Sequence, residues 1–228
     1  VKLIWKRLRK TLYICFVIEN IQVAKDISKH LLQINAIKLN PKNPFTWASG
    51  IKSPIYCDNR LILSEVNVRK YVTEKFCELI DNKFSDVEII AGVATGAIGI
   101  GMLIANQLNK PFIYVRANKK SHGRKNSIEG KFNPNEKVLV IEDLVSTGMS
   151  SLNAYDTLID GGLNVLGMVS IFTYGFDDAI SNFEKRNISY YSLSSYTYLL
   201  ESALKSNYIN KNEINFLSQW RKDPKNWK

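Results

Sequence analysis

Cysteine and histidine are scarce in this sequence of 228 residues, which contains three Cys and two His. No two cysteines form a Cys-x-x-Cys pair, so the sequence argues against a disulfide scaffold and against a Cys/His metal site. No stretch approaches the roughly 20 consecutive apolar residues that a membrane-spanning helix needs. Hydrophobic residues nevertheless make up 45% of the chain, enough for the core of one large domain. We therefore expect a cytoplasmic protein in a reducing compartment, with no membrane partner.

Positive charge is concentrated in two short segments. The net charge is +10, and residues 1–10 carry five basic side chains and no acid. Residues 116–131 carry six basic side chains against one acid, Glu129, which leaves the rest of the chain balanced. A nucleic-acid-binding surface would spread its charge more widely, so we expect no nucleic-acid partner.

The N-terminal segment has the outline of a targeting sequence. Its basic residues are followed by the mostly apolar stretch 11–18, but no small-residue cleavage site precedes the next helical pattern. Three interpretations stay open: an extension without a defined role, a membrane-surface or targeting segment, and a cleaved signal. We assign residues 1–18 to an extension and residues 19–228 to a single domain.

Apolar spacing predicts an α/β fold. Spacings of three and four residues predict a helix over 23–34, and Ser64 is a predicted N-cap for a second helix that buries Val66 and Val72. Four short apolar runs then predict buried strands at 87–93, 112–115, 138–141 and 165–171. Helical segments lie between most of these runs, which indicates a parallel sheet covered by helices. The polar stretch 116–137 is predicted to be a long loop, and helical pieces with a polar tail are expected after Tyr174.

The strongest chemical signal lies between Val138 and Ser151. Glu142 and Asp143 follow an apolar run, at the edge where open α/β sheets bind ligands. A turn and a helix start come next, and backbone N–H groups at such a position favour a phosphate. The residues of this turn and helix start are Ser146, Thr147, Gly148, Met149 and Ser150. Ordinary helix capping beside two solvated acids is the alternative interpretation.

Two further segments are predicted to meet anions. The glycine-rich segment 92–101 follows another predicted strand, and N–H groups around Ala94, Thr95 and Gly96 could cradle a second anion. A simple packing turn is the alternative there. The basic loop then supplies Arg116, Lys119, Lys120 and His122, which suit a diphosphate leaving group. A solvated charged loop and a nucleic-acid patch are the alternatives, although this stretch has no aromatic residue for base stacking.

Together these segments resemble the type I phosphoribosyltransferases. Residues Val138–Ser150 match the thirteen-residue signature with which that family binds phosphoribosyl diphosphate (PRPP). In the family, the two acids hold the ribose 2- and 3-hydroxyls and the following turn holds the 5-phosphate. The order of the segments, beginning with FTWASGIKSPIYCDNR at 45–60, is similar to that of the orotate phosphoribosyltransferases. The resemblance covers roughly residue 23 to the C-terminus.

The resemblance implies a fold, a cofactor and an assembly. The fold is a mostly parallel central sheet flanked by helices, with a small N-terminal hood and a long flexible basic loop. Mg²⁺ would be held mainly through PRPP, near Glu142 and Asp143, without a direct protein site. A homodimer that shares the basic loop across subunits is expected. Lys120, His122 and Asp143 are implied as catalytic residues. The implied PRPP-binding residues are Ala94, Thr95, Gly96, Arg116, Lys119, Lys120, His122, Glu142, Asp143, Leu144, Val145, Ser146, Thr147, Gly148, Met149 and Ser150.

Segment 45–60 would line the orotate pocket. The resemblance makes Tyr56 a candidate to cover the pyrimidine face and places Ser146 near orotate as well as the phosphate turn. Some orotate enzymes have a lysine where this chain has Ala48, and some have an arginine after the strand that ends here near residues 171–175. Lys52 and Arg60 are therefore the candidates for the orotate carboxylate.

The predicted activity is transfer of ribose 5-phosphate from PRPP to orotate, giving orotidine 5-phosphate and diphosphate in pyrimidine biosynthesis. Two alternatives stay open. One is a phosphoribosyltransferase for another base, such as uracil or a purine. The other is a PRPP-sensing regulator that binds nucleic acid through its basic N-terminus.

Overall fold

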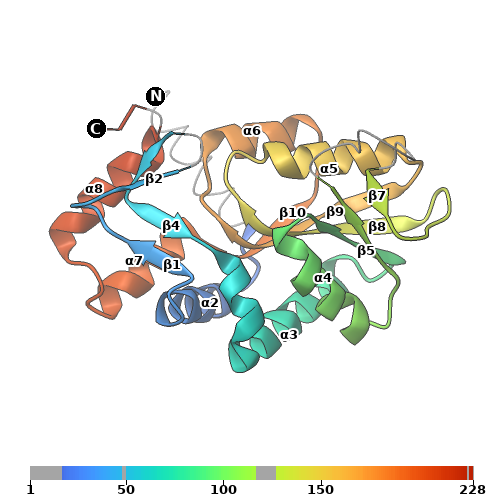
Figure 1. Ribbon diagram of the computed structural model, residues 1–228, viewed down its shortest axis with the longest axis horizontal. Helices are drawn as coiled ribbons and strands as arrows, with labels where there is room; N and C mark the ends of the chain where they lie inside the picture. The colour runs from blue at the N-terminus through green and yellow to red at the C-terminus, as the bar shows by residue number, and fades with distance from the viewer. Residues whose placement is uncertain (1–16, 48–49, 117–126, 225, 228) are drawn as a thin grey trace.

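The protein, in a computed structural model that describes residues 17–47, 50–116, 127–224 and 226–227, is built around a six-stranded sheet with helices on both faces (Figure 1). The strands in spatial order are β10 (Tyr190–Ser195), β9 (Asn164–Thr173), β8 (Lys137–Val145), β5 (Ile89–Val93), β6 (Phe112–Val115) and β7 (Ile128–Glu129). All neighbouring pairs are parallel except β6 and β7. The predicted α/β class with a mostly parallel sheet is confirmed.

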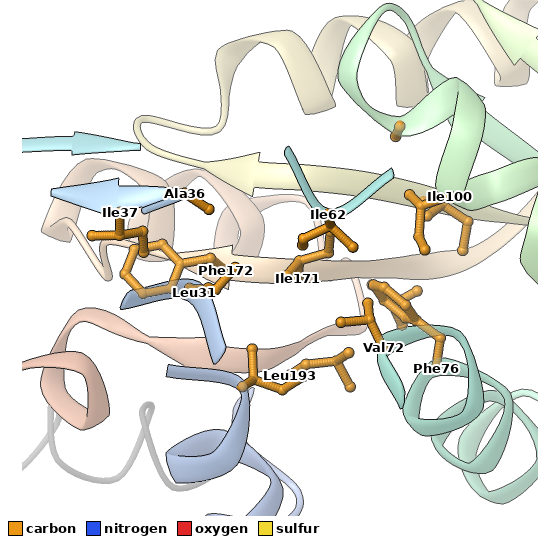
Figure 2. Packing of buried hydrophobic residues seen from close by; sticks show 14 of the residues in the cluster. Leu31, Ala36, Ile37, Ile62, Val72, Phe76, Ile100, Ile171, Phe172 and Leu193 are labelled. Atoms are coloured by element: carbon orange, nitrogen blue, oxygen red, sulfur yellow. The ribbon is translucent and has the colours of Figure 1, made fainter. Parts of the chain in front are cut away.

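Alternation along β8 divides the core between the two faces of the sheet. Val138 and Val140 pack with α5 and α6, whereas Leu139 and Ile141 belong to the larger cluster under α2, α3, α4 and α7. Figure 2 shows part of that larger cluster, in which Ile62 lies near Ile171 of β9. The helical elements are α2 (Ile21–Gln33), η1 (Asn59–Ser64), α3 (Val66–Lys83), α4 (Gly96–Gln107), α5 (Met149–Asp160), α6 (Asp177–Lys185), α7 (Tyr196–Lys205) and α8 (Lys211–Lys222). Among the described residues, no helix is both long and apolar enough to cross a membrane.

A small hood stands beside the sheet, as predicted, and is made of two antiparallel strand pairs. The pairs are β1 (Ile37–Leu39) with β4 (Ile55–Cys57), and β2 (Phe45–Thr46) with β3 (Lys52–Ser53). Trp220 of α8 anchors the hood. Its side chain is fully buried and packs against Trp47, and its Nε1–H donates to the Lys52 carbonyl at 3.2 Å. The C-terminal segment is thus part of the same packed unit as the hood (Figure 1).

The structure corrects several predicted boundaries. α3 begins at Val66 with Glu65 as its N-cap, because Ser64 already ends η1. Val66 is 50% exposed, and Val68 takes the predicted buried position. Val17 and Ile18, which we assigned to the extension, are buried in the cluster that includes α5. Most of the extension, residues 1–16, lies outside the described residues.

Two strands of the six-stranded sheet, and the burial of one C-terminal residue, were not predicted. β10 has the sequence YYSLSS, in which the serines interrupt the apolar pattern expected of a buried strand. These serines can be buried because they form hydrogen bonds inside the protein, as Ser192 does with Ser170 at 2.9 Å. β7 is only two residues long and lies within the stretch that we predicted to be loop. The tail after Tyr174 was predicted to be polar, but Trp220 within it is fully buried.

We predict that Trp220→Ala lowers the free energy of unfolding by about 3–5 kcal/mol, because it leaves a large cavity between the hood and α8. Trp220→Phe should cost about 1–3 kcal/mol, since it removes the donor to the Lys52 carbonyl and part of the buried ring. Urea unfolding followed by far-UV circular dichroism measures both. The matched control is Phe216→Ala on the same helix, where the side chain is 54% exposed. An equal loss in the control would contradict the assignment.

Candidate functional site

The two acids lie within the last part of β8, which runs to Val145, four residues beyond the predicted strand end. β5 pairs with β8 only as far as Ile141, so both acids extend past the neighbouring strand. Strand alternation turns Glu142 toward α5 and Asp143 toward α4 and η1, as their contacts show below. The predicted pair of acids is thus present, but the two side chains point to opposite faces of the sheet.

Glu142 is held in a nearly water-free position. It is 3% exposed, and the Ser151 hydroxyl of α5 donates to its Oε1 at 2.7 Å. Burial raises the pKa of Glu142 to about 8; the charge of Asp143 also raises it, whereas hydrogen bonds from Ser151 and Ser150 lower it. Glu142 is therefore poised to hold a proton near neutral pH in the ligand-free protein.

Asp143 lies where three elements meet. A Cβ atom added to Gly96, at the start of α4, would collide with the Asp143 carboxyl group, so glycine is required for this close approach. Asn59 of η1 donates its Nδ2–H to the Asp143 carbonyl oxygen at 2.7 Å. Burial raises the pKa of Asp143, while backbone hydrogen bonds and the nearby Arg60 guanidinium oppose that rise.

The turn after β8 contains the glycine and the helix start on which the phosphate prediction was based. Gly148 has φ +79°, and a Cβ atom there would come within 3.1 Å of the Phe183 ring. α5 starts at Met149, so its first N–H groups face the turn formed by Ser146 and Thr147. The other predicted PRPP residues of the motif are Leu144, which is half-buried, Val145, which is buried, and Met149 and Ser150, which are exposed. Because Val145 is buried in the core, only its backbone is available to a ligand.

The loop after β5 needs one correction. The Ala94 N–H donates to the Val115 carbonyl at 2.8 Å, so it is already used and is not part of an anion cradle. Thr95 and Gly96 remain as the candidate donors, at the N-terminus of α4. The peptide bond between Ala94 and Thr95 is cis.

Arg116 is the described member of the basic loop. It follows β6, and its Nη1 lies 3.3 Å from Glu129 Oε1. It borders a cavity of about 700 Å³ that also reaches Ala94 and Ser150, so it faces the same edge of the sheet as the two anion loops. Lys119, Lys120 and His122 lie outside the described residues.

The predicted orotate residues lie in or next to the hood. Tyr56 is 42% exposed on β4 and packs against Phe45, with ring centroids 5.8 Å apart. Arg60 forms two hydrogen bonds with Asp58, at 2.7 and 2.8 Å, and its charge acts on Asp143. Lys52 donates to Thr46 Oγ1 at 3.0 Å and has no such link to Asp143. Ala48 lies outside the described residues.

Two residues of the site were not predicted. Asn59 contacts Asp143 across 84 positions of sequence, and no local pattern signals a contact at that separation. Ser151 is next to the motif, and its contact with Glu142 could have been anticipated because α5 returns over β8. Among the described residues, no group of three or more His, Cys, Asp or Glu side chains is placed to hold a metal ion.

The chain is similar to known proteins over most of its length. A model of the phosphoribosyl transferase domain matches residues 62–195. The chain is 51% identical to the orotate phosphoribosyltransferase of Phocaeicola vulgatus over 203 residues, which is 89% of this chain and 96% of the relative. It is 48% identical to that of Porphyromonas gingivalis over 205 residues, 90% of this chain and 98% of the relative. The crystal structure of orotate phosphoribosyltransferase from Aeropyrum pernix is similar in fold, with a TM-score of 0.70 and 24% identity, covering 81% of this chain and 99% of that chain.

We predict that Glu142→Gln makes the stability of the ligand-free protein less dependent on pH. The pKa of Glu142 rises from 4.5 to about 8 on folding, so the stability linked to its proton is complete below pH 4.5 and lost as the pH rises toward about 8. As the pH rises through that window, the free energy of unfolding of the variant should increase relative to that of wild type by at most about 1.4 kcal/mol per pH unit. Urea unfolding at several pH values measures this gain.

The control for this prediction is Glu201→Gln, whose side chain is 53% exposed on α7. Its pH profile should follow that of wild type. A Glu142→Gln profile parallel to wild type would show that Glu142 is ionised in the folded protein throughout this range.

Proposed function

The chain belongs to the orotate phosphoribosyltransferase family, whose members transfer the ribose 5-phosphate group of PRPP to orotate in pyrimidine biosynthesis, and we propose that the transfer takes place between the hood and the carboxyl ends of β5 and β8. One observation carries this placement: Asp143 lies between the phosphate turn after β8, the loop after β5 and the Tyr56–Arg60 segment. Phosphate, diphosphate and base sites would then surround a single carboxyl group.

Catalysis would rest on position and charge. The C1–oxygen bond of PRPP breaks with positive charge on the ribose ring and negative charge on the departing diphosphate. Asp143 would hold a ribose hydroxyl, and the turn at Ser146–Ser150 would hold the 5-phosphate. Glu142 would reach the second hydroxyl only after its hydrogen bond from Ser151 opens on substrate binding. Arg116, with Lys119, Lys120 and His122, would neutralise the diphosphate as it leaves. We infer no covalent enzyme intermediate, because orientation of the two substrates and charge stabilisation account for the chemistry.

The residues present fit a magnesium ion that is held mainly through PRPP. Asp143 offers carboxylate oxygens, the ligands that Mg²⁺ prefers. Glu142 faces the other side of β8 and is bonded to Ser151, so the two acids form no protein-built cage and substrate oxygens would supply most of the ligands. Mg²⁺ would supply neutralisation of the diphosphate charge when bound.

We also place the enzyme in a reducing cytosol. Cys57 and Cys77 are free, and burial raises the pKa of both thiols, that of Cys77 to about 11. Such thiols are protonated and poorly reactive at neutral pH, which is consistent with a protein that does not use them in disulfides.

The activity is tested by mixing the protein with PRPP, Mg²⁺ and orotate and following the loss of orotate absorbance. We expect orotidine 5-phosphate and diphosphate to form, with no reaction in parallel samples that contain uracil, adenine or hypoxanthine. Reaction of another base instead of orotate would change the pocket assignment. PRPP binding without turnover, accompanied by salt-sensitive binding to nucleic acid, would favour a regulator.

We also propose a homodimer that shares the basic loop across subunits. Association is supported by exposed apolar side chains on three neighbouring elements, Leu61 of η1, Val66 of α3 and Met102 of α4. Lys120→Ala and Asp143→Asn should each lower turnover by orders of magnitude, because each removes a charge that the transition state needs. If the loop serves the partner's site, mixing the two variants restores roughly a quarter of wild-type turnover, since half of the dimers are mixed and each has one intact site.

The homodimers of each variant are the controls for this mixture, and sedimentation establishes that the subunits have exchanged. No recovery in confirmed mixed dimers would place the loop on its own subunit's site. Near-normal turnover of Lys120→Ala alone would remove Lys120 from the mechanism.

A further inference from the structure

Asn59 connects the hood to the end of β8. Its side chain is 3% exposed, its Nδ2–H donates to the Asp143 carbonyl at 2.7 Å, and its Oδ1 accepts from the Cys57 thiol at 3.3 Å. The amide N–H and the amide oxygen of Asn59 are therefore both hydrogen-bonded, the first to β8 and the second to β4. A buried amide with both ends paired fixes its neighbours, since breaking either bond leaves a polar group without a partner away from water.

The carbonyl to which Asn59 donates lies in the part of β8 that is not paired with β5. β5 pairs with β8 only as far as Ile141, whereas β9 pairs with it as far as Val145. Asn59 therefore stabilises β8 from the hood side, beyond the last β5 pair. The carboxyl group of the same residue, Asp143, packs against Gly96, so the carbonyl and the side chain of Asp143 are both fixed.

The two elements that the Asn59 side chain joins would bind different substrates in the proposed reaction. Tyr56 and Arg60 flank the connection on the hood side and are assigned to orotate, while Asp143 is assigned to the ribose of PRPP. The hood segment is itself anchored at the other side, because the Asp58 N–H donates to the Ala36 carbonyl at 2.7 Å. The Asn59 amide thus sets how far apart the orotate and ribose groups are held.

We propose that Asn59 is a positioning residue for the transfer reaction, which keeps the orotate pocket and Asp143 in register so that the base nitrogen meets C1 of the ribose. This inference rests on the proposed function. Asn59 touches neither substrate in this arrangement; it acts through Asp143 and the Tyr56–Arg60 segment. A misplacement of about 1 Å between reacting groups can cost about 10²-fold in rate while each substrate still binds.

The test compares Asn59→Ala and Asn59→Asp with wild type in steady-state assays that vary PRPP and orotate separately. Asn59→Asp keeps the size of the side chain and the acceptor for Cys57 but removes the N–H donor. We expect both variants to lower kcat by roughly 10- to 100-fold, with the KM values for PRPP and for orotate each within about threefold of wild type.

The matched control is Thr73→Val. It removes another buried hydrogen bond from a side chain to the backbone, from Thr73 Oγ1 to the Arg69 carbonyl at 2.8 Å within α3. It should leave kcat unchanged, whatever its effect on the thermal midpoint. A merely structural role for Asn59 would make the Asn59 variants behave like this control.

Each remaining outcome is decisive. Wild-type kcat in Asn59→Asp would overturn the proposal, because the donor would not matter. A raised KM for orotate with normal kcat would make Asn59 part of the pocket wall and would also overturn it. A wild-type protein that does not turn over orotate would overturn the proposed function, and this inference with it; an active wild type with unaffected Asn59 variants would overturn the inference alone.

Discussion

Two neighbouring carboxyl groups are held out of water at the end of β8, and the arrangement of the site follows from that burial. Removing a carboxylate from water is costly unless hydrogen bonds or opposite charges compensate. Strand alternation sends the two side chains to opposite faces, so their compensation comes from different elements. Ser151 of α5 donates a hydrogen bond to Glu142. Asp143 packs against Gly96, accepts a hydrogen bond from Asn59 at its carbonyl, and lies near the charge of Arg60. The positions of α5, α4 and the hood are thereby tied to one strand end.

The two acids are consequently unequal. Burial raises the pKa of both, but the Arg60 guanidinium lowers that of Asp143 and is not among the groups that act on Glu142. The nearby guanidinium favours the charged form of Asp143, and no such cation acts on Glu142. The charge of Asp143 would lie on the face toward the hood, where a cationic ribose would develop in the proposed reaction.

Local signals predicted the parts of the protein whose structure is determined locally. The apolar runs located four strands, and the residues from Glu142 to Ser150 located the turn before α5. Buried strands and helix starts can be located in this way because their signals lie in consecutive residues. β10 escaped prediction because its serines bond to residues outside the strand, such as Ser170 and Ser28. Trp220 escaped because its neighbours come from separate parts of the chain, the hood and the segment after β9. Asn59 belongs to this second group. The residues that tune the site are thus the ones that composition and spacing reveal least.

The aromatic cluster between the hood and α8 bears on which cation could meet the orotate carboxylate in the proposed reaction. Tyr174 and Phe176 stack at 5.2 Å with an interplanar angle of 8°, after β9, where some orotate enzymes have an arginine. Trp220 packs on both rings, so this position is filled by apolar groups and supplies no positive charge. The cation proposed for the carboxylate would then be Lys52 of the hood or Arg60 of η1. Both already have a partner: Lys52 donates to the Thr46 hydroxyl, and the Arg60 guanidinium donates twice to the Asp58 carboxylate. Binding of the orotate carboxylate would therefore require one of these cations to exchange its present partner for the substrate.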